Sequence, residues 1–320
     1  MNKIKIGILG YGNLGKAVEK LATKEEEIVL LGIFSKRRNI KSIYNKPVYT
    51  KEQLLKFKDK IDLLVICSGS EKDMLVDAPL YAKHFNIINT FDTHALILQE
   101  FEKLNDISKQ SNHMSIISAG WDPGLFSMIK AAFYSILGEF PVCFWGKGTS
   151  LGHSNAVKNI DGVIDAISFT VPETSEISKA RLGIETSPNT RHTREVFVTI
   201  KANANRSKIE NQIKNIENYF KGQHTTVNFV SLNDLEKLKT FTHKGLVIGS
   251  KTTSEGLKFS LELSATMSSN SEFTAMIILS YAKAIKKLKT KYPAGAYTPL
   301  HFSPLDILSA DEKQMIKLFC

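Results

Sequence analysis

Apolar runs of six or seven residues alternate with helix-compatible segments along the first 120 residues. The runs predict strands at 4–9, 28–34, 61–67, 86–91 and 114–119. The clearest helical segments lie at 73–84 and 95–111. Strands that alternate with helices form a parallel sheet with right-handed crossovers. We therefore predict an α/β fold in which residues 1–120 form a Rossmann-type, doubly wound parallel sheet.

From about residue 140 the pattern changes to shorter runs. These runs predict strands at 166–171, 194–200, 225–229 and 257–263, with helices at 207–219 and 272–289. Such a mixture is typical of an α+β domain with a mostly antiparallel sheet. We expect residues 121–267 to bind substrate and to form a dimer interface, and residues 268–320 to return to the first domain.

The first apolar run leads into Gly10-Tyr11-Gly12-Asn13-Leu14-Gly15, ahead of a helix-compatible segment. Between a strand and a helix, this spacing of glycines is typical of dinucleotide binding. Gly10 permits the tight turn, Gly12 lets a pyrophosphate approach the backbone, and Gly15 lets the helix pack on the sheet. The helix N-terminus then offers free N–H groups to the phosphates.

The second predicted strand ends in Ser35-Lys36-Arg37-Arg38. Proteins that prefer NAD usually carry Asp or Glu here, which binds the ribose 2′-hydroxyl. A hydroxyl and three cations instead suit a 2′-phosphate, which guanidinium groups bind in a bidentate way. The sequence therefore favours NADP over NAD. The alternative is a basic turn that only faces solvent.

Polar segments also follow the other predicted strands. Because ligands bind at the carboxyl ends of parallel strands, we expect the cofactor to contact residues of all five strand ends. These residues are Gly10, Tyr11, Gly12, Asn13, Leu14, Ser35, Lys36, Arg37, Cys67, Ser68, Gly69, Ser70, Thr90, Phe91, Asp92, Gly120, Trp121, Asp122, Pro123 and Gly124.

The net charge of +10 does not by itself exclude any class of binding partner. Lysines are spread along the chain and no known nucleic-acid-binding motif occurs, so we expect no nucleic-acid partner. No apolar run reaches the roughly eighteen residues of a membrane span. Cys67, Cys143 and Cys320 have neither metal-ligand spacing nor a disulfide framework. We expect a reduced cytoplasmic protein with no signal peptide, no metal and no membrane partner.

Five segments, in order along the chain, carry a family resemblance. They are Gly10–Gly15, Phe34–Arg37, Gly120-Trp121-Asp122-Pro123-Gly124, the run Phe144–Ser154 and Gly295-Ala296-Tyr297-Thr298. Together they resemble the meso-diaminopimelate D-dehydrogenase family. The resemblance implies NADP-dependent oxidative deamination of the D-centre of meso-2,6-diaminopimelate, with L-2-amino-6-oxopimelate, ammonia and NADPH as products. It also implies a homodimer and, in the reverse direction, a reductive amination that feeds lysine biosynthesis.

The resemblance assigns Asp92 and Asp122 to the D-centre amino group, with Trp121 beside them. Two carboxylates can hold an ammonium and then accept its proton, since hydride leaves Cα most readily when the nitrogen is neutral. A carboxylate or His153 would assist the water that attacks the imine. A turn residue before Pro123 and a structural histidine are the respective alternatives for Asp122 and His153.

The resemblance also assigns residues to the two substrate carboxylates. Trp145 would bind the D-centre carboxylate, together with backbone around Leu151 and Gly152, and simple core packing is its alternative. The distal carboxylate would be bound by the guanidinium of Arg194, which can grip it in two places.

Thr170 and His243 would accompany this arginine, and Asn270 would add a late polar contact. Two alternatives stay open from the residues alone. Arg191 could replace Arg194 if the strand register slipped, and His243 could be an exposed loop histidine.

Two positions depart from the family pattern. Many relatives carry Gln where this chain has Leu151, and Asp where it has Asn155. Leu151 cannot donate a side-chain hydrogen bond, and Asn155 removes a negative charge. We hypothesise that these changes broaden the substrate range toward simpler D-amino acids or 2-keto acids.

Two rival functions fit the residues less well. A sugar oxidoreductase of the same architecture would carry Glu-Lys-Pro after the fourth strand, where this chain has Phe91-Asp92-Thr93-His94. An NADP-sensing regulator would have little use for the acids, Trp and Arg that the chain retains. A reductase of another small substrate and a sensor remain the alternatives.

Overall fold

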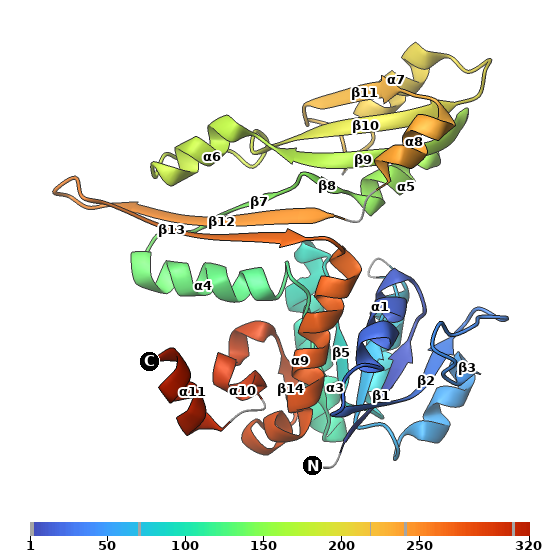
Figure 1. Ribbon diagram of the computed structural model, residues 1–320, viewed down its shortest axis with the longest axis vertical. Coiled ribbons are helices and arrows are strands. Elements are labelled where there is room, and N and C mark those ends of the chain that lie inside the picture. Colours follow the sequence, from blue (N-terminus) through green and yellow to red (C-terminus); the bar gives the residue numbers. More distant parts are fainter. Residues whose placement is uncertain (1–2, 70–71, 218, 240–241, 309–310) are drawn as a thin grey trace. The chain divides into compact units, whose positions relative to one another are not determined.

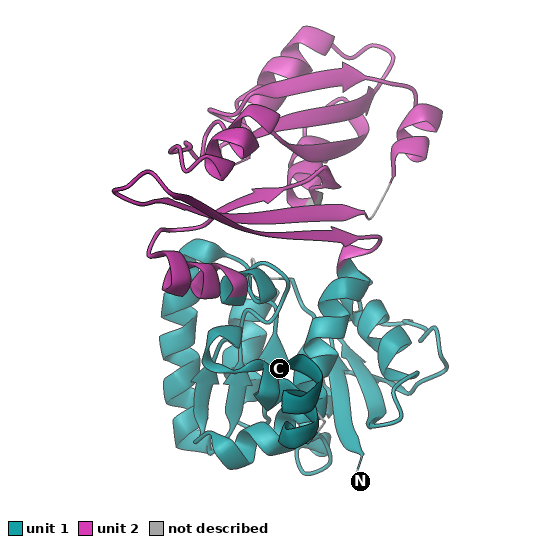
Figure 2. Ribbon diagram, turned by 60° about the vertical axis from the view of Figure 1, so that its left-hand side comes forward, with its two compact units in different colours: residues 1–128, 271–320 teal, residues 129–270 magenta. Residues whose placement is uncertain are grey.

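The structure is a computed structural model that describes all residues except 1–2, 70–71, 218, 240–241 and 309–310, and at Leu151 it describes the backbone alone. The chain divides into two compact units. Unit 1 comprises residues 1–128 and 271–320, and unit 2 comprises residues 129–270 (Figure 2). The C-terminal segment therefore belongs to the same unit as the N-terminal sheet.

The described residues of unit 1 contain a seven-stranded sheet in the order β14-β6-β5-β4-β1-β2-β3 (Figure 1). All of its strand pairs are parallel. The strands are β1 (Ile4–Leu9), β2 (Ile28–Ser35), β3 (Val48–Thr50), β4 (Leu63–Ile66), β5 (Ile87–Asn89), β6 (Met114–Ile116) and β14 (Gly295–Tyr297). The predicted α/β fold with a parallel sheet is confirmed.

Helices cover both faces of this sheet because its strands are apolar on both sides. In β4, Leu63 and Val65 belong to one core cluster, and Leu64 and Ile66 belong to the other. The first cluster includes side chains of α1 and α9, and the second includes side chains of α2 and α3. These helices are α1 (Asn13–Ala22), α2 (Asp73–Ala82), α3 (Ile97–Ser111) and α9 (Asn270–Lys291). Unit 1 also contains the short 3₁₀ helices η1 (Lys51–Phe57), η2 (His94–Leu96) and η3 (Pro299–His301).

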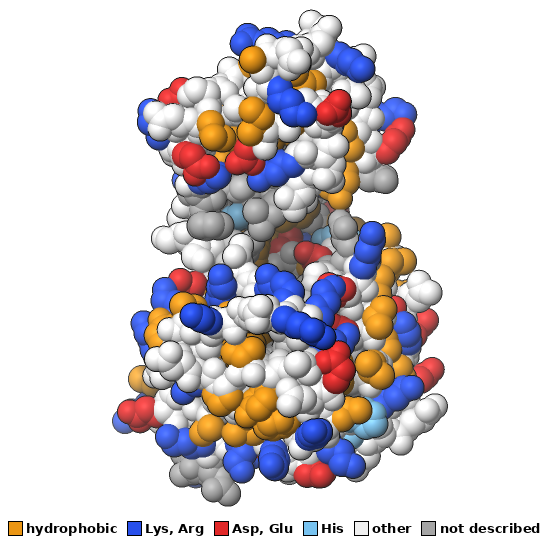
Figure 3. Space-filling view, turned by 90° about the vertical axis from the view of Figure 1, so that its right-hand side faces the viewer, with side chains coloured by type: hydrophobic (Ala, Val, Ile, Leu, Met, Phe, Trp, Pro, Cys, Tyr) orange, Lys and Arg blue, Asp and Glu red, His pale blue; other side chains and the backbone are white. Residues whose placement is uncertain are grey.

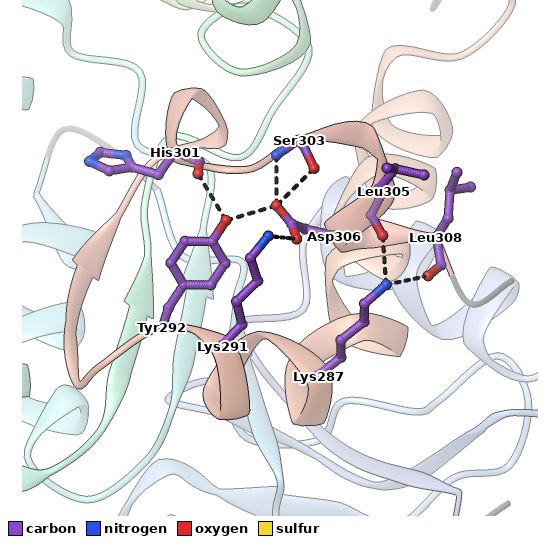
Figure 4. Close-up of polar contacts among 8 residues, drawn as sticks. All are labelled: Lys287, Lys291, Tyr292, His301, Ser303, Leu305, Asp306 and Leu308. Atoms are coloured by element: carbon purple, nitrogen blue, oxygen red, sulfur yellow. Dashed lines mark hydrogen bonds and ion pairs between the residues drawn. The ribbon is translucent and has the colours of Figure 1, made fainter. Parts of the chain in front are cut away.

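The C-terminal tail is fastened to the end of α9 (Figure 4). The buried Asp306 carboxylate lies in α10 (Pro304–Ile307) and accepts hydrogen bonds from Lys291, from Tyr292 and from the backbone and hydroxyl of Ser303. Lys287 donates to the backbone carbonyls of Leu305, within α10, and of Leu308, just after it. The last helix, α11 (Glu312–Phe319), follows.

The described residues of unit 2 form two sheets. The four-stranded sheet has the order β11-β10-β9-β8, and the three-stranded sheet has the order β13-β12-β7. Only the β10–β11 pair is parallel among their described pairs. The strands are β7 (Val142–Trp145), β8 (Gly148–Thr149), β9 (Val163–Pro172), β10 (His192–Ile200), β11 (Thr225–Phe229), β12 (His243–Thr252) and β13 (Lys258–Met267).

Helices pack on both faces of the four-stranded sheet. Val157 of α5 (Leu151–Lys158) and Ile209 of α7 (Arg206–Lys214) share a core with Val196 and Val198. Leu235 of α8 (Leu232–Leu238) packs on the other face, against Phe169. Two further helices are α4 (Leu125–Leu137) and α6 (Thr174–Arg181).

The predicted helix at 207–219 is too long. It ends at Lys214, because the Asn215 side chain turns back to donate to the carbonyl of Asn211 at 2.8 Å. An Asn amide that binds the preceding turn competes with the backbone and favours a helix end. The sequence reading also missed β7, β8, β12 and the helices α4, α5, α6 and α8.

Candidate active site

The turn between β1 and α1 depends on two glycines. Gly10 has φ +92°, and a Cβ there would lie 2.8 Å from the backbone of Cys67. A Cβ on Gly15 would lie 2.3 Å from the carbonyl oxygen of Gly10. By contrast, a Cβ on Gly12 would meet no atom within 4 Å, so this stretch of backbone is open to a ligand. The turn thus has the geometry that a pyrophosphate requires.

A cavity of about 260 Å³ lies at the carboxyl ends of β1, β2 and β4. Among the residues expected to bind a cofactor, its lining contains Gly10, Tyr11, Gly12, Ser35, Lys36, Arg37, Cys67, Ser68 and Gly69. Asn13, Leu14 and the predicted residues of the β5 and β6 ends are not part of this lining as the described residues form it. Ser70 lies outside the described residues.

Basic side chains border the cavity at the end of β2. Lys36, Arg37 and Arg38 are exposed, and Figure 3 shows Lys and Arg side chains gathered on the face of unit 1 that carries β2 and β3. Arg37 donates from its guanidinium to the carbonyl of Tyr11, and its backbone N–H donates to the Ser35 hydroxyl at 3.1 Å. Burial, followed by the Glu19 contact, raises the pKa of Tyr11 to about 12, so its hydroxyl stays protonated at neutral pH.

Sequence reasoning missed three charged residues of the cavity, namely Lys51, Asp73 and Asp77. Lys36 forms an ion pair with Asp73 at 2.7 Å. Lys51 pairs with the buried Asp77, which also accepts a hydrogen bond from Ser68 at 2.7 Å. Asp73 and Asp77 lie one helical turn apart in α2, and the N-terminus of this helix follows β4. This place after a strand end was the only feature of the sequence that could have marked the two acids as cavity residues.

The ends of β5 and β6 are tied together by side chains. The Asn89 amide oxygen accepts hydrogen bonds from the backbone of Phe91 and Ser118, and the Ser118 hydroxyl donates to the Phe91 carbonyl at 2.8 Å. These bonds fix the segments that carry Asp92 and Asp122. Asp92 is exposed and Asp122 is half-buried.

Asp122 lies in a tight turn that closes on itself. The N–H of Gly120 donates to the carbonyl of Pro123 at 3.1 Å, and the Asp122–Pro123 peptide is cis. Gly124 has φ +133°, and a Cβ there would collide with the carbonyl of Gly120. The Trp121 ring packs edge-on against Phe126, the second residue of α4. The turn therefore holds Trp121 and Asp122 at the start of a helix.

The side chain of Arg194, on β10 of unit 2, is held by a residue of the neighbouring strand β9. It pairs in register with Thr170 across β9 and β10, and its guanidinium donates to the Thr170 hydroxyl at 2.5 Å. Burial lowers its pKa. Its buried Nε finds no acceptor among the described residues. Arg191 instead donates to the hydroxyl and carbonyl of Thr186.

His153 is held by polar contacts on both ring nitrogens. Nδ1 lies 2.7 Å from the Ser150 hydroxyl, and Nε2 lies 2.9 Å from the carbonyl of Tyr219. Because a carbonyl only accepts, these contacts assign the proton to Nε2. Burial, followed by the charge of Arg194, lowers the pKa of His153 to about 4. His153 is therefore neutral at pH 7.

His192 was not predicted, although it opens β10 two residues before Arg194. Its ring stacks on Trp145, with centroids 5.2 Å apart, and its Nε2 accepts a hydrogen bond from the Trp145 backbone at 2.8 Å. Burial, followed by the charges of Arg194 and Arg191, lowers the pKa of His192 to about 4. A neutral histidine thus supports Trp145.

The remaining predicted residues of unit 2 lie at element ends. His243 begins β12 and contacts Gly148, where an added Cβ would lie 3.0 Å from its ring. Leu151 and Gly152 form the first turn of α5, and Asn270 is the first residue of α9.

All three cysteines are free. Among the described residues, no helix has the length and apolarity that crossing a membrane requires.

Comparisons with known proteins show which proteins the chain resembles. Residues 120–269 match the model of the diaminopimelic acid dehydrogenase C-terminal domain. The meso-diaminopimelate D-dehydrogenase of Acetivibrio thermocellus is 39% identical over 98% of this chain and 97% of its own length. The structure of C. glutamicum DAP dehydrogenase in complex with DAP has 31% identity, covers all of both chains and gives a TM-score of 0.92. An engineered D-amino acid dehydrogenase bound to NADP+ has 31% identity, covers all of both chains and gives a TM-score of 0.88.

Proposed function

Because the chain belongs to the meso-diaminopimelate D-dehydrogenase family, we propose that it is an NADP-dependent amino acid dehydrogenase that oxidises the D-centre of meso-2,6-diaminopimelate. The substrate, NADP+ and water yield L-2-amino-6-oxopimelate, ammonium, NADPH and a proton. The reaction is reversible, and the reverse direction is a reductive amination that serves lysine biosynthesis. The observation that carries the proposal is the similarity of the whole chain, in sequence and in fold, to these dehydrogenases.

The residues of unit 1 fit NADP. The open backbone at Gly12 suits the pyrophosphate, and the exposed cations at the end of β2 suit a 2′-phosphate. When bound, NADP+ supplies the hydride acceptor. Asn13, Leu14 and the residues of the β5 and β6 ends are proposed to contact its remaining parts.

Asp92 and Asp122 are proposed to act at the D-centre amino group. Their carboxylates accept hydrogen bonds from the ammonium and then take its proton, which leaves the nitrogen lone pair free to stabilise the carbon that loses hydride. Water then adds to the imine carbon and ammonia leaves. Trp121 is proposed to shield this centre from bulk solvent.

Arg194 is proposed to bind the distal carboxylate. Its buried Nε has hydrogen-bonding capacity to spare, while Thr170 already orients one of the terminal nitrogens. A carboxylate that meets this fork gains two charge-assisted hydrogen bonds, which Lys could not provide in the same geometry. His243 and Asn270 are proposed as polar contacts to the same L-centre.

Trp145 and the backbone at Leu151 and Gly152 are proposed to bind the D-centre carboxylate. His153 is neutral and donates from Nε2 to a carbonyl. Its Nδ1 already accepts a hydrogen bond from the Ser150 hydroxyl, so neither ring nitrogen is free to take a proton from water. We therefore propose that a carboxylate, and not His153, activates the attacking water, and that His153 orients α5 through Ser150.

A homodimer in the cytoplasm completes the proposal. Unit 2 exposes large apolar side chains where β12 ends and β13 begins, since Leu257 is 59% and Phe259 is 51% exposed. β13 is an edge strand among the described strands. A second copy would cover this surface. Light scattering should give the mass of two chains, and Phe259→Glu should shift it to one.

The three free cysteines suit a reducing compartment.

The first test of the activity is NADPH formation with each stereoisomer of diaminopimelate. We expect turnover of the meso isomer with release of ammonia, and none of the L,L isomer, which has no D-centre. Tight NADP binding without turnover of any isomer would overturn the proposed reaction and favour a different substrate or an NADP sensor.

A further inference from the structure

Glu19 is a completely buried carboxylate in the middle of α1. It accepts hydrogen bonds from the Tyr11 hydroxyl and the Ser42 hydroxyl. The backbone N–H groups of Ile43 and Tyr44 also donate to it, at 3.3 and 3.2 Å. One carboxylate thus collects four donors from two separate segments.

Burying a carboxylate in this way destabilises the folded protein unless donors occupy its hydrogen-bonding positions. A buried charge without hydrogen-bonding partners costs several kcal/mol, so every donor matters. The Tyr11 hydroxyl is a donor to Glu19 and also accepts from the backbone of Ile43 at 3.0 Å. Ser42 in turn accepts from the backbone of Lys46 at 2.7 Å. Glu19 therefore fastens the loop after β2 to the glycine turn.

The glycine turn borders the cofactor cavity, and so does the start of the loop after β2. Tyr11 lines it with its neighbours Gly10 and Gly12, and its carbonyl oxygen is the acceptor for the Arg37 guanidinium. Arg37 also lines the cavity. Glu19 itself is not part of the lining that the described residues form, and with no exposed surface it cannot contact a ligand there.

We propose that Glu19 is a positioning residue that sets the preference for NADP over NAD by holding Tyr11 and, through its carbonyl, Arg37 in place. The inference rests on the proposed NADP dependence. NADP and NAD differ only at the 2′ position, so a displaced Arg37 weakens the binding of NADP and leaves that of NAD nearly unchanged. Gln at position 19 keeps the size of the side chain. It replaces one carboxylate oxygen with an NH₂ group, which cannot accept from these donors.

The test measures the dissociation constants of NADP+ and NAD+ by calorimetric titration of the full-length protein. Glu19→Gln should raise the value for NADP+ about tenfold, the loss of one charge-assisted contact, and should change the value for NAD+ less than about twofold. The matched control is Glu100→Gln, which alters another buried carboxylate of unit 1, on α3, that is not part of the cavity lining as the described residues form it. This control should leave both constants unchanged.

A double variant tests the route through Arg37. If Glu19 acts by placing this guanidinium, then Glu19→Gln should add no further loss of NADP+ affinity in an Arg37→Ala background. Additive losses would overturn the inference, as would an equal weakening of both cofactors. If Glu19→Gln fails to fold, Ser42→Ala removes one donor from the edge of the network and should lower the NADP preference in the same direction.

The outcomes separate the inference from the function beneath it. Wild-type protein that binds NADP no better than NAD would refute the cofactor assignment and the inference together. A clear wild-type preference that Glu19→Gln and Ser42→Ala both retain would refute the role of Glu19 alone.

Discussion

The imidazole of His192 lies flat against the indole of Trp145, with ring centroids 5.2 Å apart and ring planes 21° apart. The same imidazole accepts the backbone N–H of Trp145, so ring and backbone are fixed by one side chain. His192 is 5% exposed and Trp145 is 38% exposed. The buried histidine thus presents the indole to solvent and, under the proposed function, to substrate.

We expect substitutions of His192 to weaken substrate binding more than they slow chemistry. His192→Phe keeps a stacking ring but loses the acceptor, and His192→Gln keeps an acceptor but loses the ring. Each should raise KM for meso-diaminopimelate several-fold, about 1 kcal/mol for one neutral hydrogen bond or one stack, with kcat nearly unchanged. Steady-state kinetics measure both constants, and a fall in kcat at unchanged KM would contradict this role.

Acid should destabilise unit 2 through its two buried histidines. Burial and Arg194 lower the pKa values of His153 and His192 from 6.5 to about 4, so the unfolded chain binds protons that the folded one does not. Their contribution to stability is complete above pH 6.5 and is lost as the pH falls toward 4, by at most roughly 3 kcal/mol for each histidine. Urea unfolding between pH 7 and 4 measures this slope. A variant with Gln at both positions should show a shallower slope, and an unchanged one would contradict the assignment.

Arg194→Met should abolish recognition of the distal carboxylate while it keeps the apolar stem of the side chain. We expect KM for meso-diaminopimelate to rise by two orders of magnitude or so, the cost of a bidentate charge-assisted contact. Discrimination against D-lysine, which lacks that carboxylate, should largely disappear. Arg191→Met is the matched control, because Arg191 binds Thr186 in its own loop. Unchanged discrimination in Arg194→Met would show that another residue reads this end of the substrate.

Asp73→Asn should strengthen NADP binding. In the structure Lys36 is paired with Asp73, and a bound 2′-phosphate would compete with this carboxylate for the ammonium. The pair is largely exposed, with 65% and 44% of the two side chains accessible, so the gain should be only about two- to fivefold. Cofactor titration at low ionic strength measures it, and affinity for NAD should not change. Weaker NADP binding would indicate that Asp73 supports the cofactor loop instead.

The parallel sheet of unit 1 was predictable because its strands are buried on both faces and are therefore uniformly apolar. β3 and β14 were not, since neither lies in a longer apolar run, and Gly295–Tyr297 pairs only because the chain returns beside Met114. The glycine turn and the β2 cations follow local rules and were predicted as a cofactor site. Lys51 and Asp77 line the same cavity from distant parts of the chain, and no local pattern marks them. His192 was hidden for a similar reason, because its partner Trp145 lies 47 positions away.

We expect Asp306 to stabilise the fold by fastening the C-terminal tail to the end of α9. This carboxylate is 3% exposed and accepts from Tyr292 at 2.7 Å and from the Ser303 backbone at 2.9 Å, besides its ion pair with Lys291. Asp306→Asn loses the charge and one acceptor, and we expect it to cost about 2 kcal/mol of unfolding free energy. Asp311→Asn, an exposed acid of the same tail, should cost nothing measurable.

The sign of the acid response distinguishes this site from the histidines. The hydrogen bonds of Lys291, Tyr292 and Ser303 outweigh the effect of burial and hold the pKa of Asp306 well below its usual 3.8. The stability that it contributes is therefore complete above pH 3.8 and is lost only below that value, after the histidine transition has ended. Proteolysis of the tail as a function of pH reports the loss directly. Two results together would show that other contacts hold the tail. The wild-type tail would already be cleaved faster as the pH falls from 7 to 5, and Asp306→Asn would not be cleaved faster than the wild type.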